Sequence, residues 1–327
     1  MEKNPTVSVI IPTYNQANFI DKAINSVLKQ TYQDFEIIVV DDGCTDNTED
    51  VIRGFPDKRV KYIKKYKKNK GISVARNLGI KVAMGKYIAL LDSDDEWLPE
   101  KLDKQIKVFK SEFPEVGVVY SNALYIDESG KNMNRKLRNS KKAEGYIYED
   151  LLGKYCVGSP SSFLIKKECF NRVGLFDDLL SGQEDWDMWI RIAKYYKFAL
   201  IKIPLVKYRL HSNQISKNLR VINIAANRIL VKYVNELEIR RGAHSKHYFY
   251  IGNRFCHMGK TKEGQRYLLK AISLCPFCIR YYICMFGSLF GPKCFIYFVN
   301  IKRCLTSVIR TLLIKLKTII YSIFLLE

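Results

Sequence analysis

The sequence predicts an α/β protein whose mostly parallel sheet is covered by helices on both faces, followed by an all-helical extension. Strand-like and helix-like segments alternate from the N-terminus. The strand-like segments are continuous apolar runs, which are typical of strands buried on both faces. After residue 215 the strand-like runs stop. We therefore expect two domains, residues 1–215 and 216–327.

The first four strands and helices follow from local composition and spacing. Apolar residues at helical spacing separate short β-branched runs. Thr45 or Asp46 is placed to cap the second helix, Gly85 to end the third, and Pro99 to begin the fourth. We expect strands at residues 7–11, 35–40, 60–63 and 86–91, and helices at residues 18–30, 45–53, 72–84 and 99–109.

The pattern is more mixed in the second half of the chain. Residues 132–142 are polar and basic, which favours a mobile loop. Residues 248–274 resemble one helix-turn-helix unit of the tetratricopeptide type. The other expected elements are strands at residues 116–120 and 161–165, helices at residues 186–195 and 218–238, and a helical hairpin or interfacial segment at residues 281–299.

The positive charge is concentrated in the last third of the chain. The formal net charge is +21, and residues 216–327 hold 19 Lys and Arg against 4 Glu, a net charge of +15. Residues 1–215 are nearly balanced, with 35 basic and 29 acidic residues. A basic segment of this kind favours contact with a polyanion, either a nucleic acid or an anionic membrane surface.

The cysteines and the N-terminus indicate a protein with reduced thiols. The number of cysteines, nine, is odd, and the first residues lack the charged, apolar and small-residue plan of a secretory signal. We therefore expect a cytoplasmic protein. Cys275 and Cys278 have the spacing of half a zinc site, but no second ligand pair follows at a suitable distance, so buried free thiols are favoured.

Polar residues follow three of the expected strands. Pro12, Thr13 and Tyr14 follow the first, Asp41 and Asp42 the second, and the acidic stretch 92–96 the fourth. Ligands bind at the carboxyl ends of strands in such sheets. Acids there either bind a hard divalent cation or are solvated turn residues. Glycine-rich phosphate loops are absent after the first strand, so a metal would hold any phosphates.

Five segments together resemble the family 2 glycosyltransferases, which have the GT-A fold. The resemblance covers about residues 5–215, and residues beyond are similar to the tails of bacterial transferases for capsule and cell-surface polysaccharides. Cys44 is a departure, since the family more often has Ser. The segments are VSVIIPTYN (7–15), VVDDGCTDNT (39–48), GISVARNLGI (71–80), YIALLDSDDEWLPEKL (87–102) and GQEDWDMWIRI (182–192).

The resemblance implies an inverting transfer of a sugar from a nucleoside diphosphate sugar to a hydroxyl group. A UDP-sugar is the favoured donor, and the acceptor is a lipid-linked sugar or a glycan. Asp94 and Asp92 would be the family's Asp-x-Asp, which holds Mn2+ or Mg2+, with Asp95 nearby. The nucleotide-binding residues that the resemblance implies are Pro12, Thr13, Tyr14, Asp42, Arg76 and Asp92.

Inversion at an anomeric carbon requires a base opposite the leaving diphosphate. By position in the family, Asp185 is this base and Glu184 is the second choice. Without the resemblance, both would be acids favoured at a helix N-terminus. Trp186 is a candidate acceptor contact, and Arg209 and His211 are candidate diphosphate contacts. A structural hydrogen bond is the alternative for His211.

Residues 300–326 predict a basic amphipathic helix. Their apolar residues have helical spacing, and Arg303, Arg310 and Lys317 recur every seven residues. Such a helix suits an anionic membrane surface, so we expect peripheral association with the inner face of the cell membrane. No nucleic acid is expected as a partner, since no binding module for one is recognisable. The alternative is a helix that packs on the protein's own core.

Two other functions are compatible with parts of the sequence. A sugar-nucleotide nucleotidyltransferase also binds metal-bound phosphates on a parallel sheet, but its glycine-rich basic loop is absent. A membrane scaffold with a degenerate transferase domain is the non-enzyme alternative. The presence of Asp42, Asp92, Asp94 and Asp185 argues against such decay.

Overall fold

The computed structural model forms two compact units, Met1–Lys232 and Tyr233–Glu327. Helix α8 (Leu219–Lys232), expected in the extension, belongs to the first unit, where Lys232 forms ion pairs with Asp177 and Asp187. The residues that the structure describes are 4–64, 71–111, 114–137, 143–180, 182–212, 214, 218–292 and 295.

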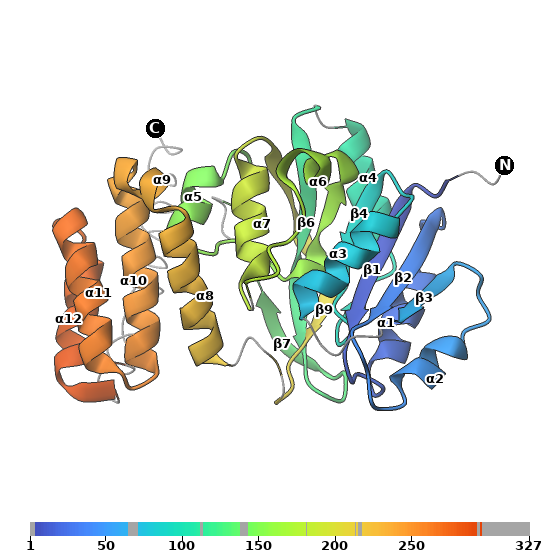
Figure 1. The fold of residues 1–327 in the computed structure, drawn as a ribbon, viewed down its shortest axis with the longest axis horizontal. Helices are drawn as coiled ribbons and strands as arrows, with labels where there is room; N and C mark the ends of the chain where they lie inside the picture. The colour runs from blue at the N-terminus through green and yellow to red at the C-terminus, as the bar shows by residue number, and fades with distance from the viewer. Residues whose placement is uncertain are drawn as a thin grey trace, which may run out of the picture. The chain divides into compact units, whose positions relative to one another are not determined.

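One sheet forms the centre of the first unit (Figure 1). Its strand order is β3-β2-β1-β4-β8-β6-β9-β5, and β7 pairs with β6. The strands are β1 (Val7–Thr13), β2 (Phe35–Asp41), β3 (Val60–Lys64), β4 (Tyr87–Leu90), β5 (Glu96–Trp97), β6 (Val116–Ile126), β7 (Asn132–Leu137), β8 (Leu164–Lys166) and β9 (Lys197–Arg209).

The four N-terminal strands are parallel, and all residues of β1, β2 and β4 are buried, as the continuous apolar runs predicted. The sheet as a whole is mixed. Strand β8 runs antiparallel to both neighbours, β4 and β6, and β9 runs parallel to β6. The apolar runs predict burial but not strand direction, so the reversed strand could not be recognised from them.

Helices cover both faces of this sheet. Helices α1, α2 and α4 contribute to the core cluster that includes Val7, Val9 and Ile11. Helix α3 lies on the opposite face, where a Cβ on Gly79 would come within 2.6 Å of the Ile10 side chain. The helices are α1 (Ile20–Leu28), α2 (Thr48–Arg53), α3 (Ile72–Val82), α4 (Lys101–Ser111), α5 (Tyr148–Gly153), α6 (Lys167–Val173) and α7 (Glu184–Ala193), with a 3-10 turn η1 (Pro160–Ser162).

Three local predictions are wrong in the first unit. The residue that caps α2 is Asn47, not Thr45 or Asp46. Helix α3 ends at Val82, and Gly85 has another role, since a Cβ there would lie 2.5 Å from the backbone nitrogen of Ser8. Gly85 therefore lets the chain pass close to β1. Residues 132–137, expected in a loop, form β7, because their backbone pairs with β6.

The second unit is helical, as expected, and contains α9 (Val234–Ile239), α10 (Arg241–His257), α11 (Thr261–Leu274) and α12 (Ile279–Leu289). Helices α10 and α11 form the predicted helix-turn-helix pair. Their axes approach closely because two glycines face each other, and a Cβ on Gly252 would lie 2.8 Å from the Gly264 oxygen. The helix expected at residues 218–238 is interrupted at Tyr233, between α8 and α9.

Not every expectation for the C-terminal region can be compared with the described residues. The amphipathic helix expected at residues 300–326 lies outside them. Among the helices that are described, none is long and apolar enough to cross a membrane. Cys275 and Cys278 are free, half-buried thiols that pack against the core of the second unit.

Candidate active site

The candidate site lies where the strand order reverses. Strands β1 and β4 are neighbours, and β2 and β3 lie on the other side of β1. In doubly wound sheets, a crevice opens at the carboxyl ends of the strands at such a point. Tyr14, Asp42 and Asp92 follow β1, β2 and β4 there, so the structure brings these three loops to one edge of the sheet.

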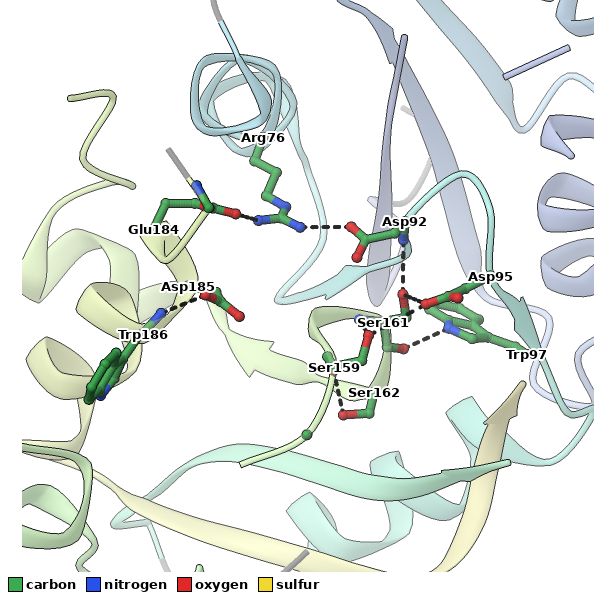
Figure 2. Close-up of polar contacts among 12 residues, drawn as sticks. Arg76, Asp92, Asp95, Trp97, Ser159, Ser161, Ser162, Glu184, Asp185 and Trp186 are labelled. Carbon is green, nitrogen blue, oxygen red and sulfur yellow. Dashed lines mark hydrogen bonds and ion pairs between the residues drawn. The ribbon is translucent and has the colours of Figure 1, made fainter. Parts of the chain in front are cut away.

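The acidic loop after β4 divides its carboxylates between the protein interior and the surface. Asp95 is 1% exposed and accepts hydrogen bonds from the Ser161 hydroxyl at 2.6 Å and from the Arg209 backbone at 2.9 Å. Burial, together with the charges of Asp94 and Asp92, raises the pKa of Asp95 well above its ordinary value. Asp95 therefore fixes the shape of the loop (Figure 2).

Arg76 joins this loop to the start of α7. Its guanidinium donates to Asp92 at 2.7 Å and to Glu184 at 2.7 Å, and the side chain is 1% exposed (Figure 2). Burial lowers the pKa of Arg76, but the charges of Asp92 and Glu184 outweigh it and raise the pKa above its ordinary range. The cation therefore neutralises two acids that lie far apart in the sequence.

Asp185 follows Glu184 in the first turn of α7. Its Oδ1 accepts the Trp186 backbone N–H at 2.8 Å, and its Oδ2 accepts the Tyr155 hydroxyl at 2.6 Å. Burial and the neighbouring Glu184 charge raise the pKa of Asp185 to about 7. A carboxyl with this pKa can accept a proton near neutral pH.

The residues near the expected nucleotide site come from three elements. Asp42 accepts the Gly71 backbone N–H at 2.9 Å, which links β2 to the start of α3, the helix that carries Arg76. Tyr14 is 42% exposed after β1. Pro12 and Thr13 are the last residues of β1, and both are buried.

His211 and Arg209 both contact Asp94 in the acidic loop. His211 contacts Asp94 through Nε2 at 2.8 Å. Arg209 is fully buried, and its guanidinium donates to Glu96, to the Asp94 backbone oxygen at 2.8 Å and to the Glu128 backbone oxygen at 3.0 Å. The expected diphosphate contact of Arg209 does not fit this burial, since its donors support the loop.

Trp186 is a core residue. It is 0% exposed and donates its indole N–H to the Leu151 backbone oxygen at 2.6 Å, which holds α7 against α5. The ring thus has no exposed surface for the acceptor contact expected of it. Trp189, one turn further on, is also buried and stacks on Phe163 with ring centroids 4.1 Å apart.

The carboxylates of the loop have a donor set that fits a hard divalent cation. The side chains of Asp92 and Asp94 are 22% and 19% exposed, whereas Asp95 is buried. Oxygen ligands from one or two carboxylates suffice for Mg2+ when phosphates supply others. No group of three or more His, Cys, Asp or Glu side chains within the described residues has metal-binding geometry.

Two residues at the site were not recognised in the sequence, Tyr155 and Ser161. Both lie between α5 and β8, and Ser161 was expected at the start of a strand at residues 161–165, whereas it lies in the turn η1 and the strand begins at Leu164. Ser161 accepts the Asp92 backbone N–H at 3.0 Å and donates to Asp95. The only local signal was the Ser-Pro-Ser-Ser stretch at residues 159–162, which is typical of a turn but does not indicate a partner.

Comparisons with known proteins agree with this architecture. Residues 8–174, just over half of the chain, match the family model described as glycosyl transferase family 2. The Escherichia coli UDP-Glc:alpha-D-GlcNAc-diphosphoundecaprenol beta-1,3-glucosyltransferase WfgD is 33% identical over 214 residues, which cover 65% of this chain and 80% of the relative. An uncharacterized glycosyltransferase of Rickettsia bellii is 33% identical over 236 residues, but the chain spans only 34% of its length.

Solved structures share the fold at lower identity. S. aureus TarS 1–349 in complex with UDP-GlcNAc has a TM-score of 0.59 and 20% identity, covering 82% of this chain and 80% of that one. The Pyrobaculum calidifontis mannosyltransferase PcManGT in complex with GDP-Man and Mn2+ has a TM-score of 0.58 and 18% identity, covering 84% and 74%. The chain therefore belongs to glycosyl transferase family 2, and it is a glycosyltransferase with the GT-A fold.

Proposed function

We propose that this glycosyltransferase moves a sugar, with inversion, from a nucleoside diphosphate sugar to a hydroxyl of a lipid-linked or glycan acceptor in cell-surface polysaccharide synthesis. The observation that carries the proposal is the double ion pair of Arg76 with Asp92 and Glu184. The Arg76 guanidinium connects the end of β4, where the diphosphate is expected, to the start of α7, which carries the expected catalytic base. The leaving group and the base would therefore act at one centre.

The donor would lie across the loops after β1, β2 and β4. Tyr14 offers an exposed aromatic face to the nucleobase. Asp42 offers a carboxylate to an N–H of the nucleobase or to a ribose hydroxyl. Asp94 and Asp92 would hold Mn2+ or Mg2+, which when bound places positive charge on the departing diphosphate. His211 would orient Asp94 through its 2.8 Å contact.

Asp185 would act as the base of a single displacement. The acceptor oxygen forms a bond to the anomeric carbon while the bond to the diphosphate oxygen breaks, and the hydroxyl proton passes to Asp185. The nucleoside diphosphate leaves from the opposite side, so the anomeric configuration inverts. The pKa of about 7 suits this role, because general bases act best when their pKa is near the working pH.

The relatives support the substrate classes without agreeing on one donor. TarS is described with UDP-GlcNAc, PcManGT with GDP-Man and Mn2+, and WfgD by its UDP-Glc donor and a diphosphoundecaprenol acceptor. A UDP-sugar is our preferred donor. The basic charge of residues 216–327 supports peripheral association with an anionic membrane, where a lipid-linked acceptor is found.

The test is a donor screen with the full chain. UDP-Glc, UDP-GlcNAc and GDP-Man are each incubated with Mn2+ or with chelator, and release of nucleoside diphosphate is measured with an undecaprenyl-diphosphate sugar as acceptor. We expect one donor to be turned over only with metal, and the product to have the inverted configuration by NMR.

Two aspartate variants sharpen this screen. Asp94→Asn should reduce turnover at least a hundredfold, while Asp178→Asn, an exposed aspartate before α7, should leave turnover unchanged. Normal turnover by Asp94→Asn, or equal turnover with chelator, contradicts the metal assignment. A retained anomeric configuration contradicts the single displacement.

A further inference from the structure

The Tyr155 hydroxyl lies between two acceptors at the candidate base. It is 2.6 Å from Asp185 Oδ2 and 2.7 Å from the backbone oxygen of Gly158. A tyrosine hydroxyl has one proton and so donates one such hydrogen bond at a time. The Gly158 oxygen can only accept. Both contacts can therefore be made at once only when a proton on Asp185 is donated to Tyr155.

Two proton arrangements follow from these distances. When Asp185 is ionised, Tyr155 donates to its Oδ2 and the Gly158 oxygen loses this donor. When Asp185 carries a proton on Oδ2, it donates to Tyr155, and Tyr155 donates to Gly158. Burial and the Asp185 charge raise the pKa of Tyr155 well above its ordinary value, so the hydroxyl keeps its own proton in both arrangements.

Two charged side chains act on the Asp185 carboxylate in opposite directions. Glu184 opposes the charge of Asp185, while Arg76, on α3, supports it. Lys232, on α8, is paired with Asp187 at 2.8 Å. Among the described residues, the Tyr155 hydroxyl is the side-chain hydrogen-bond donor that contacts Asp185.

The segment that carries Tyr155 is anchored at the acidic loop. Six residues further along, Ser161 donates to Asp95 and accepts the Asp92 backbone N–H, and its backbone oxygen accepts the Trp97 indole N–H at 2.8 Å (Figure 2). One short segment thus contacts the Asp-x-Asp loop at one end and the candidate base at the other.

We propose that Tyr155 is a positioning residue for the transfer reaction, which holds Asp185 by donating to its ionised form and accepts a hydrogen bond from it after the acceptor's proton has arrived. This inference rests on the proposed function, in which Asp185 is the base. The simpler alternative is that Tyr155 only fixes the turn at Gly158, and this alternative predicts a loss of stability without a change in pH dependence.

The test is the pH dependence of kcat/KM for Tyr155→Phe. Without the hydroxyl donor the ionised form of Asp185 is less favoured. The rising limb of the plot of kcat/KM against pH should therefore move about one to two units to higher pH. At pH 6.5 the rate should fall about ten- to a hundredfold, and near pH 9 it should return to within a few-fold of the parent. KM for the donor should stay unchanged. Tyr146→Phe is the matched control, since Tyr146 is 66% exposed.

A second variant keeps the test decisive if Tyr155→Phe does not fold. Incorporation of 3-fluorotyrosine at position 155 retains the ring and the hydroxyl but makes the hydroxyl a stronger donor. The limb should then move to lower pH, opposite to the phenylalanine variant. An unchanged limb in the folded variants, with only a lower Tm, overturns the proposal in favour of the structural alternative.

The result can be separated from a failure of the proposed function. Asp185→Asn is measured in parallel. If it keeps near-normal turnover, Asp185 is not the base and the proposed function fails at that residue. If it is inactive while the pH limb of Tyr155→Phe matches that of the parent, only the role of Tyr155 is wrong.

Discussion

Replacement of the candidate base should make the protein more stable while it removes activity. Burial raises the pKa of Asp185 to about 7, against an ordinary value of 3.8. Below about pH 4, both the folded and the unfolded chain hold the proton, and the group has no effect. Between about pH 4 and pH 7 the unfolded chain releases it and the folded chain keeps it, so stability falls as the pH rises.

The magnitude follows from the difference between the two pKa values. Roughly three pH units at 1.36 kcal/mol per unit correspond to about 4 kcal/mol above pH 7. Asp185 is half-buried, so this is an upper bound. In Asp185→Asn the amide nitrogen can donate to Tyr155, which then donates to Gly158, so the hydrogen bonds are kept. The stability gain of the variant should therefore grow by about 2–3 kcal/mol between pH 5 and pH 8.

Urea unfolding of parent and variant at pH 5 and pH 8 measures this gain. All three tryptophans, Trp97, Trp186 and Trp189, lie in the first unit, so their fluorescence reports its unfolding. Asp178→Asn is the control and should show no pH-dependent gain. The reasoning is refuted if Asp185→Asn is no more stable at pH 8 than at pH 5 relative to the parent, or if it retains transfer activity.

Three further predictions concern other buried or charged groups. Arg76→Met should lower the free energy of unfolding by about 3–5 kcal/mol, because Asp92 and Glu184 lose their shared cation. Adding Glu184→Gln should restore part of this loss. Urea unfolding that shows no restoration would mean that the ion pairs are weak. Burial lowers the pKa of Lys101 well below its ordinary value, so at pH 7 the folded chain binds fewer protons than the unfolded chain. Lys101→Met should therefore raise the free energy of unfolding at pH 7, and this gain should fade toward pH 10. A gain that does not depend on pH contradicts this reasoning. Deletion of residues 300–327 should abolish sedimentation with anionic vesicles, and continued sedimentation would exclude that segment as the anchor.

The two ion pairs that Arg76 forms, with Asp92 and with Glu184, show why part of the site could not be predicted. Each acid was identified from its place after a strand or before a helix. Their partner, Arg76, was expected only to border the nucleotide. Its double ion pair depends on α3 lying against β1 and β2, where Gly79 permits close packing. Side-chain partners so distant in sequence leave no periodic signal along the chain.

The amino-acid sequence by itself determined the alternation of buried strands and helices, the acids at the strand ends and the family. These features follow from local patterns, because an apolar run or a turn residue acts through its immediate neighbours. Only the tertiary structure decided that β8 runs antiparallel, that Asp95 and Trp186 face the interior, and that Tyr155 contacts Asp185. Those outcomes depend on which segments pack together, and packing between distant segments is set by the whole chain.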